Sequence, residues 1–341
     1  MRALVRYGTG EEEVRIEETP EPVCGPGEVK IRVRAAGVCG TDLHGHPSLS
    51  PPVILGHEIA GEIVEVGKDV KRRKVGERVT SETTAEICGE CRFCKTENYN
   101  VCRRRKGIAT KAPGGFAEYF AIREGSVHAL PNGIGYDEGA LTEPLACAVH
   151  AAAEQGGVRK GELVAVVGPG PLGLLVTQVA KAKGARVILA GTAADAQRLA
   201  LGRKLGADRI VFVEKEKVEE LARSMSDGYG ADLAIECSGT AGGVKGALAS
   251  VRTMGRYVQG GILHRTVELD LDEIFFGREI TMYGSHTQKP SSWREALQLL
   301  GEGKIDLGAL ITDRMRLSEW KEAFRRMLAK EAIKVILHPE G

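Results

Sequence analysis

The chain has 341 residues, of which 43% are hydrophobic and 27% are charged, so it can bury a large core and is long enough for two domains. Its 47 basic and 46 acidic residues leave a formal net charge of +1, and such a balance creates no field that would recruit nucleic acid or an anionic membrane. No stretch approaches the roughly 18 apolar residues of a membrane span, and no apolar run precedes a cleavage site at the N-terminus.

We therefore expect a cytoplasmic protein that acts on a small molecule, with neither nucleic acid nor membrane as a partner. Thiols stay reduced in the cytoplasm, so clustered cysteines there favour a metal site or catalysis over disulfides.

Residues 28–120 have the pattern of a largely β domain with irregular loops. In EVKIRVRA (28–35) apolar and charged residues alternate, which is typical of a half-buried strand. GVCGTDLHGH (37–46) and GHE (56–58) follow, and they bring a thiol, imidazoles and a carboxylate. A catalytic zinc needs only three protein ligands, because substrate or water takes the open position. Cys39 and His57 are the first two candidate ligands; the alternative is a buried cysteine in a strand-end turn and a core histidine.

The segment ICGECRFCKTENYNVC (87–102) places four cysteines at spacings of three, three and eight: Cys88, Cys91, Cys94 and Cys102. Four thiolates in such a loop can reach one ion tetrahedrally, with Zn–S distances of about 2.3 Å. The spacing predicts a structural zinc site. It leaves open an iron–sulfur cluster, four free thiols, and a zinc ribbon for nucleic acid, which RRRK (103–106) favours locally and the neutral whole-chain charge opposes.

Beyond residue 150 the pattern changes to that of a βαβ unit. LVAVVG (163–168) is an apolar run typical of a parallel strand covered on both faces, and a helical apolar period follows until KG closes it before ARVILAG (185–191). GPGPLG (168–173) lies between strand and helix. There Gly168 permits a tight turn, Gly170 lets a pyrophosphate approach the backbone, and Gly173 allows close helix–strand packing.

Further strands are expected at 231–239, 256–261 and 278–284, and a helix and a last strand (IKVIL) follow after residue 318. A tail of about 57 residues has little core of its own, so it should complete the first domain. We expect an α/β protein in which residues 1–147 and 285–341 form the β-rich catalytic zinc domain. Residues 148–284 form an inserted dinucleotide-binding domain with a doubly wound parallel sheet.

Several motifs together carry a family resemblance. GVCGTDLHGH, GHEIAGEIVEVG, the four-cysteine loop, EPLACAVH and GPGPLG occur in this order, and the chain resembles the zinc-containing medium-chain dehydrogenase/reductase family over essentially its whole length. TEPLACAVH (142–150) resembles the polyol (sorbitol-type) branch, in which the glutamate before Pro-Leu, here Glu143, supplies a carboxylate near the catalytic zinc. Threonine dehydrogenases tend to carry aspartate there, so oxidation of a 3-hydroxy amino acid is the alternative.

The resemblance implies a GroES-like catalytic domain with an inserted Rossmann domain, and it assigns the cysteine loop to a structural zinc. Cys39 and His57 match the firm ligands of a catalytic zinc, Glu58 a carboxylate beside the metal, and Glu143 the third position of the branch. Thr41 and His44 match the hydroxyl and the imidazole of a proton relay. The implied reaction transfers a hydride between a secondary alcohol or polyol and NAD(P), in a homo-oligomer, tetramer or dimer.

The cofactor is expected to be NADP in preference to NAD. NAD-specific folds of this kind carry Asp or Glu at the end of the second strand, and that position here is Gly191. Gly191 would give room for a 2′-phosphate, Thr192 a hydrogen bond and Arg198 a charge; the alternative for Arg198 is a solvated surface residue. Asp195 is expected to serve the start of the next helix. The remaining candidate cofactor contacts are Pro171, Leu172, Ser238 and Lys334, the last of which matches a basic residue at the pyrophosphate in some relatives.

A rival hypothesis is a non-catalytic relative that binds dinucleotide and keeps zinc for stability. The presence of Cys39, His57, Glu58 and Glu143 together argues against it.

Overall fold

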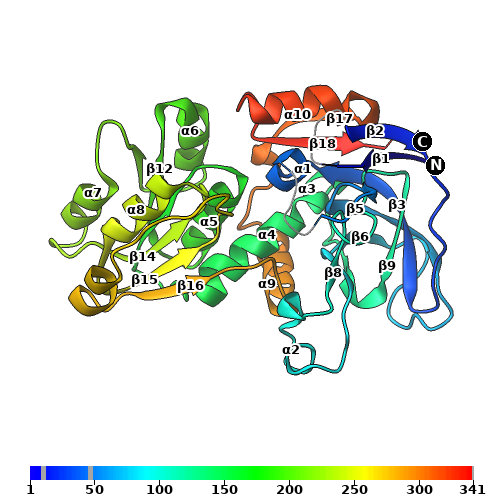
Figure 1. Cartoon of the computed structure of the whole chain (residues 1–341), viewed down its shortest axis with the longest axis horizontal. Helices are drawn as coiled ribbons and strands as arrows, with labels where there is room; N and C mark the ends of the chain where they lie inside the picture. The colour runs from blue at the N-terminus through cyan, green and yellow to red at the C-terminus, as the bar shows by residue number, and fades with distance from the viewer. Residues whose placement is uncertain (9–12, 45–48, 340–341) are drawn as a thin grey trace. The chain divides into compact units, whose positions relative to one another are not determined.

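The computed structural model describes residues 1–8, 13–44 and 49–339. By their contacts the residues form two compact units, Met1–Glu143 with Leu307–Gly341, and Pro144–Asp306 (Figure 1). The second unit is therefore an insertion in the first. Within the described part of the chain, no helix is both long and apolar enough to span a bilayer.

The first unit is built mainly of strands. They are β1 (Arg2–Arg6), β2 (Val14–Glu18), β3 (Glu28–Gly37), β4 (Val53–Ile54), β5 (Glu58–Val66), β6 (Arg78–Ser81), β7 (Thr84–Glu86), β8 (Lys106–Gly107), β9 (Tyr119–Arg123), β10 (Val127–Ala129), β17 (Ile311–Arg316) and β18 (Lys334–His338). Its helices and 3-10 turns are α1 (Gly40–His44), α2 (Arg92–Lys95), η2 (Tyr99–Val101), η3 (Glu124–Ser126), α3 (Tyr136–Ala140), η7 (Gly308–Leu310), η8 (Leu317–Glu319) and α10 (Trp320–Leu328).

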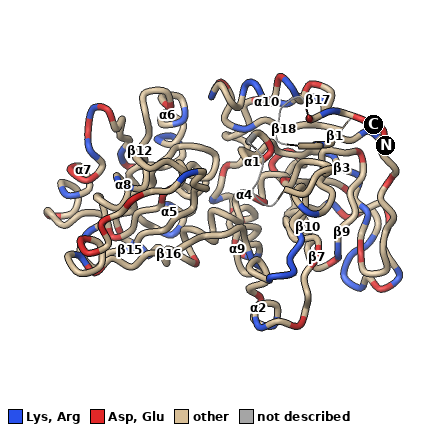
Figure 2. Tube along the Cα trace, in the orientation of Figure 1, with Lys and Arg blue, Asp and Glu red and all other residues tan. Residues whose placement is uncertain are grey.

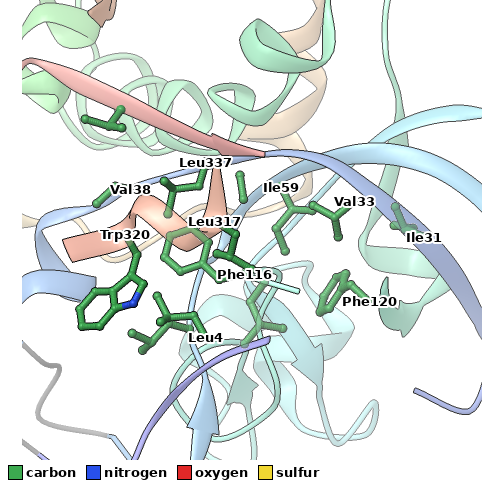
Figure 3. Packing of buried hydrophobic residues seen from close by; sticks show 14 of the residues in the cluster. Leu4, Ile31, Val33, Val38, Ile59, Phe116, Phe120, Leu317, Trp320 and Leu337 are labelled. Atoms are coloured by element: carbon green, nitrogen blue, oxygen red, sulfur yellow. The ribbon is translucent and has the colours of Figure 1, made fainter. Parts of the chain in front are cut away.

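The main sheet of this unit has the strand order β10-β6-β5-β3-β18-β17, and β9 pairs with β3 as well. The predicted alternation in β3 is confirmed, because Val29, Ile31, Val33 and Ala35 are all buried. Figure 3 shows the core that these strands share with α10, including Ile59 of β5. This packing fixes the end of β3, where the first candidate ligand follows.

The second unit is a parallel sheet with helices. Its elements are η4 (His150–Gln155), β11 (Leu163–Val167), α5 (Pro171–Ala182), β12 (Arg186–Gly191), η5 (Ala193–Asp195), α6 (Ala196–Lys204), β13 (Arg209–Phe212), α7 (Val218–Ser224), β14 (Ala231–Glu236), α8 (Ala241–Ser250), β15 (Val251–Gln259), η6 (Asp272–Gly277), β16 (Thr281–Gly284) and α9 (Pro290–Gly301). Helix α4 (Thr142–Val149) begins at the last residues of the first unit and continues into the second.

The sheet of the second unit has the order β13-β12-β11-β14-β15-β16 with every pair parallel. This is the strand order of a Rossmann fold, with β11 as its first strand. All five residues of β11 are buried, as the apolar run predicted. The predicted fold class is confirmed in both units.

The predicted domain boundaries, 1–147 with 285–341 and 148–284, stay a prediction, and the compact units change after Glu143 and after Asp306. Hydrogen bonds explain why residues 285–306 lie with the second unit. The side chain of Gln178 donates to the Asp306 carbonyl at 3.2 Å and accepts from its N–H at 2.7 Å. At the start of α9, Ser292 Oγ donates to the Glu154 carboxylate at 2.9 Å. A strand-and-helix pattern carries no signal for such contacts.

Candidate zinc centres and dinucleotide site

Three strands meet where the first candidate site forms. The last residue of β3, Gly37, pairs with Glu58 at the start of β5 and with Ile336 of β18. Gly37 must lack a side chain, because a Cβ there would lie 2.0 Å from Glu58 Oε2. The next residue continues the ladder, as Val38 N–H donates to the Val335 carbonyl at 2.9 Å. Cys39 and His57 therefore follow and precede paired strand ends, and this brings them together.

Cys39, His57 and Glu58 form one group, in which a ligand atom of each lies within 4.8 Å of the others. A thiol, an imidazole and a carboxylate are donors that zinc accepts in proteins. The second oxygen of Glu58, Oε2, is buried and makes no hydrogen bond in the structure, so it is available as a ligand. The residues present fit a zinc ion.

Asp42 supports this group and was missed by sequence reasoning. Its Oδ2 accepts the N–H of Cys39 at 2.9 Å, and its Oδ1 lies 3.5 Å from His57 Nδ1. Burial alone would lower the pKa of His57, but the Asp42 carboxylate and Cys39 outweigh burial and raise it. A carboxylate on one ring nitrogen fixes the orientation and tautomer of a ligand histidine, which leaves Nε2 for the metal. The available signal was its place in CGTD, three residues after Cys39 in the first turn of α1.

We expect Asp42→Asn to weaken zinc binding at this group by about 10- to 100-fold, because an amide cannot accept both from Cys39 N–H and from His57. Competition with a chromogenic chelator measures the affinity. Asp137→Asn is the matched control: Asp137 accepts from Arg314 Nε at 2.6 Å and His338 Nε2 at 2.8 Å in the same unit, remote from the ligands in sequence. Equal zinc affinity in the wild type and Asp42→Asn would contradict the supporting role.

Lys334 does not stand where the sequence analysis placed it. Its Nζ is buried and donates to Glu58 Oε1 at 2.6 Å and to the Val38 carbonyl at 2.9 Å. Burial alone would lower the pKa of Lys334, but the Glu58 carboxylate raises it, so the lysine remains a cation. In the structure this side chain holds one oxygen of Glu58, and a contact with a cofactor pyrophosphate is corrected to this ion pair. The reason is the pairing of β18 beside β3, which sequence patterns do not reveal.

The remaining candidates around the catalytic group are placed as follows. Thr41 Oγ1 lies 3.4 Å from His57 Nε2. Glu143 is buried in the first turn of α4, outside the three-residue group, but its charge contributes to the raised pKa of Lys334. His44 is the last residue of α1, and its side chain lies outside the described part of the structure.

The four cysteines of the loop, hereafter the cysteine lobe (residues 88–102), converge on one point. The Sγ–Sγ distances are 3.8 Å for Cys88–Cys94, 3.5 Å for Cys91–Cys94 and 3.6 Å for Cys88–Cys102. A tetrahedral ion with Zn–S distances of about 2.3 Å requires sulfur atoms about 3.8 Å apart. All four are free thiols. The geometry matches a four-thiolate zinc site.

The thiols also differ in acidity. Hydrogen bonds from the backbone N–H groups of Cys91 and Glu90 lower the pKa of Cys88 to about 6. Burial and the thiol of Cys91 raise the pKa of Cys94 to about 12. Four thiolates at this distance repel one another, so a bound cation is needed to hold all of them deprotonated.

The cysteine lobe is tied to the β sheet by polar contacts. Tyr99 OH donates to both oxygens of Glu82 at 2.8 Å, and His128 Nε2 lies 3.0 Å from the same carboxylate.

The basic run at 103–106 is bound internally as well. Arg105 donates to Thr83 Oγ1 at 2.8 Å and Lys106 to Glu86 at 3.0 Å. Figure 2 shows basic and acidic residues interspersed along both units. This distribution gives no support to the nucleic-acid ribbon.

In the second unit the glycine-rich turn has the expected shape. Gly168 has a φ of +102°, which disfavours any residue with a Cβ. A Cβ at Gly173 would lie 1.9 Å from the Gly168 carbonyl oxygen, so the helix packs directly on the turn. Gly170 precedes α5 and a Cβ there would meet open space, whereas Pro171 and Leu172 form the first turn of the helix, half-buried. The helix N-terminus and open backbone fit a pyrophosphate.

At the end of β12 the structure revises the reason for a glycine. Gly191 is the last residue of the strand and is buried, and a Cβ there would lie 2.7 Å from Pro169 Cγ. Its small size therefore serves packing, rather than room for a phosphate. The exposed residue is Thr192, whose Oγ1 donates to Asp195 Oδ2 at 2.6 Å. Asp195 also accepts from Thr192 N–H at 3.1 Å, so it caps the following turn as predicted.

Two charged side chains lie beside this loop. Arg198 Nη1 lies 3.8 Å from Asp195 Oδ1 and is largely buried, so the solvated alternative is wrong. Glu214 accepts the N–H of Ala193 at 3.0 Å. Ser238, after β14, donates its N–H to Glu236 at 2.7 Å and lies against Gly168.

Comparison with known proteins agrees with these features. The family model "Alcohol dehydrogenase GroES-like domain" matches residues 25–132, and "Zinc-binding dehydrogenase" matches residues 171–302. The chain is 43% identical over 343 residues to sorbitol dehydrogenase of Halalkalibacterium halodurans, covering 99% of each. It is 40% identical over 342 residues to D-arabitol-phosphate dehydrogenase of Enterococcus avium, covering 99% of this chain and 97% of that one.

A solved structure from Sinorhizobium meliloti, described as a zinc-binding dehydrogenase bound to NADP, has a TM-score of 0.90 and 32% identity, covering 99% of both chains. Similarity of this extent reaches across both units and both groups of candidate zinc ligands. The chain is thus an oxidoreductase of the zinc-containing medium-chain dehydrogenase/reductase family and resembles the polyol dehydrogenases within it.

Proposed function

We propose that the protein oxidises a secondary alcohol or polyol to the ketone, with NADP or NAD as hydride acceptor, and catalyses the reverse reduction. The carbinol carbon loses a hydride to the cofactor and its hydroxyl loses a proton, so alcohol and NADP⁺ give ketone, NADPH and H⁺. The observation that carries the proposal is the convergence of Cys39, His57 and Glu58 at the end of β3. The names of the two relatives at 40% identity or more, both polyol dehydrogenases, support this substrate class.

Cys39, His57 and Glu58 are the side chains that would hold the catalytic zinc, with Glu143 as a nearby carboxylate. A zinc ion there supplies a Lewis acid that polarises the substrate oxygen and lowers the pKa of its hydroxyl. Asp42 orients His57 through Nδ1, and Lys334 holds Glu58 Oε1 so that Oε2 faces the ligand group. The Cys88, Cys91, Cys94 and Cys102 thiols would hold a second, structural ion.

Thr41 is placed to receive the proton of the substrate hydroxyl. Its Oγ1 lies 3.4 Å from the ligand nitrogen of His57, next to the point where an oxygen would bind the metal. A hydroxyl can accept one proton while donating its own, so Thr41 can pass the proton onward. His44, three residues along α1, is the proposed next member of the relay.

The second unit would bind the dinucleotide, and we propose that it takes NADP at least as well as NAD. The exposed residue after β12 is Thr192, and a neutral side chain does not repel a 2′-phosphate. Arg198 adds a nearby positive charge, and the carboxylate of Asp195 is engaged by Thr192. The structure of the relative bound to NADP is consistent with this preference.

A carboxylate introduced at this loop should reverse the preference. Gly191→Asp would force Pro169 to move, so Thr192→Glu is the better variant. We expect it to raise the ratio of kcat/KM for NAD over NADP by about 10- to 100-fold, because a like charge beside a phosphate costs a few kcal/mol. Steady-state kinetics with both cofactors measure the ratio. Thr192→Gln, which adds bulk without charge, is the control; a ratio that moves equally in both variants, or in neither, would contradict the assignment.

A substrate screen tests the proposed function. Sorbitol, arabitol, their phosphate esters and simple secondary alcohols are offered with either cofactor, and formation of the reduced nicotinamide is followed by absorbance. We expect turnover with at least one polyol by protein that holds two zinc ions per chain. Dinucleotide binding without turnover, together with a single zinc ion per chain, would favour the non-catalytic relative. A homo-oligomer and a cytoplasmic location remain proposals from the family resemblance, and light scattering tests the first.

A further inference from the structure

A buried carboxylate, Glu236, lies at the C-terminal end of the central strand pair of the second unit. It is the last residue of β14, which pairs with β11, and its side chain is inaccessible to solvent. From β11 the sheet extends through β12 to β13 on one side, and from β14 through β15 to β16 on the other. In open parallel sheets, ligands bind outside the carboxyl ends of strands where the order reverses in this way. Glu236 therefore lies directly beneath the expected dinucleotide position.

Both oxygens of Glu236 accept hydrogen bonds from the turn that follows it. Oε1 accepts the N–H of Ser238 at 2.7 Å, the Ser238 hydroxyl, and the N–H of Gly239 at 3.1 Å. Oε2 accepts the N–H of Gly239 at 3.1 Å and Gln259 Nε2 at 2.8 Å. Every partner is a donor. The site thus requires a group with two acceptor oxygens, as a carboxylate has and an amide lacks.

The surroundings leave this carboxylate one position. A Cβ at Gly243 would lie 2.7 Å from Oε1, and a Cβ at Gly261 would lie 2.6 Å from Oε2. The negative charge also lies at the N-terminal end of α8, where Thr240 caps the helix by accepting from Gly243 N–H at 3.0 Å. Partial positive charge at a helix N-terminus stabilises an anion there.

The turn that Glu236 shapes packs against the glycine-rich motif. A Cβ at Gly168 would lie 2.6 Å from Ser238 N and 2.8 Å from Ser238 Cα, so these two backbone segments are in direct contact. Any shift of the 237–240 turn would alter the space beside Gly168. The two segments together form the edge that a dinucleotide would meet.

We propose that Glu236 is a positioning residue for the dinucleotide: its carboxylate fixes the turn 237–240 against Gly168, so that the cofactor meets an edge already formed. The inference rests on the proposed function, because it assigns a role toward that same cofactor. Glu236 does not touch the cofactor; it acts through Ser238 and Gly239.

The test compares two carboxylates on one strand. Asp232, near the opposite end of β14, accepts Leu163 N–H at 2.8 Å and Arg252 Nε at 2.7 Å, far along the strand from the turn. Glu236→Gln turns an NH₂ group toward N–H donors, and we expect the Kd for NADP, measured by calorimetry without substrate, to rise about tenfold or more. Asp232→Asn should lower the melting temperature but leave the Kd unchanged. In turnover, Glu236→Gln should raise the KM for the cofactor and leave the KM for the alcohol and the zinc content unchanged.

Unchanged Kd in Glu236→Gln, or an equal rise in Asp232→Asn, would overturn the inference while the proposed function stands. A wild-type protein that binds neither NADP nor NAD would overturn both. If Glu236→Gln fails to fold, Gln259→Met carries the test, since it removes a single donor to Oε2. A Kd raised severalfold in that variant supports the inference, and an unchanged Kd overturns it.

Discussion

Replacing Cys39 with alanine is expected to lower kcat/KM for the alcohol by about 10³-fold or more and to leave one zinc ion per chain. A Lewis acid on the substrate oxygen contributes several kcal/mol to the transition state, and each 1.36 kcal/mol corresponds to about a tenfold change in rate. Loss of one of three ligands removes the ion from the group formed with His57 and Glu58. The cysteine lobe is a separate cluster, so its ion should remain.

Metal analysis and steady-state kinetics on the same preparation measure both effects. Cys24→Ala is the control, because Cys24 is a free thiol of the same unit outside both clusters. Near-normal turnover by Cys39→Ala, or retention of both ions with no loss of activity, would contradict the assignment of the catalytic group.

Cys91→Ser should act on stability rather than on chemistry. Binding of a structural zinc ion contributes directly to folding free energy, and a loss of about 3 kcal/mol lowers the melting temperature of a domain of this size by about 6–12 °C. Cys91 Sγ lies 3.5 Å from Cys94 Sγ, so the substitution breaks the tetrahedron. The zinc content should fall by one ion per chain, whereas kcat per folded molecule should be nearly unchanged.

Calorimetric melting, zinc content and active-site titration on the same sample separate these effects. Cys147→Ser is a suitable control, because Cys147 belongs to neither cluster. A Cys91→Ser protein that melts with the wild type and keeps both ions would show that the cysteine lobe holds no structural metal.

Local patterns predicted much of the fold. Alternation in β3 and the continuous apolar run of β11 indicate how many faces of each strand are buried, and this depends only on neighbouring residues. The glycine-rich turn was predicted for the same reason, because Gly168 and Gly173 are required by the backbone within one turn. The convergence of the four cysteines also follows from short spacing.

Contacts between distant segments could not be predicted in this way. Lys334 meets Glu58 only because β18 pairs with β3 on the side opposite β5, a register that no local pattern encodes. Gly191 is explained by the ring of Pro169, which belongs to the preceding turn. Asp42 and Glu236 were missed because each acts through hydrogen bonds to other site residues, and a single sequence gives no signal for an acceptor that must face several donors.

Transfer of deuterium from the carbinol carbon of a polyol to the cofactor tests the central claim most directly. Sorbitol or arabitol labelled at a secondary carbon is incubated with the two-zinc protein and NADP, and the reduced nicotinamide is examined by mass spectrometry. The account predicts one deuterium in the reduced cofactor for each ketone formed, with no transfer in the Cys39→Ala protein. Absence of label from the reduced cofactor, or equal transfer by Cys39→Ala, would contradict it.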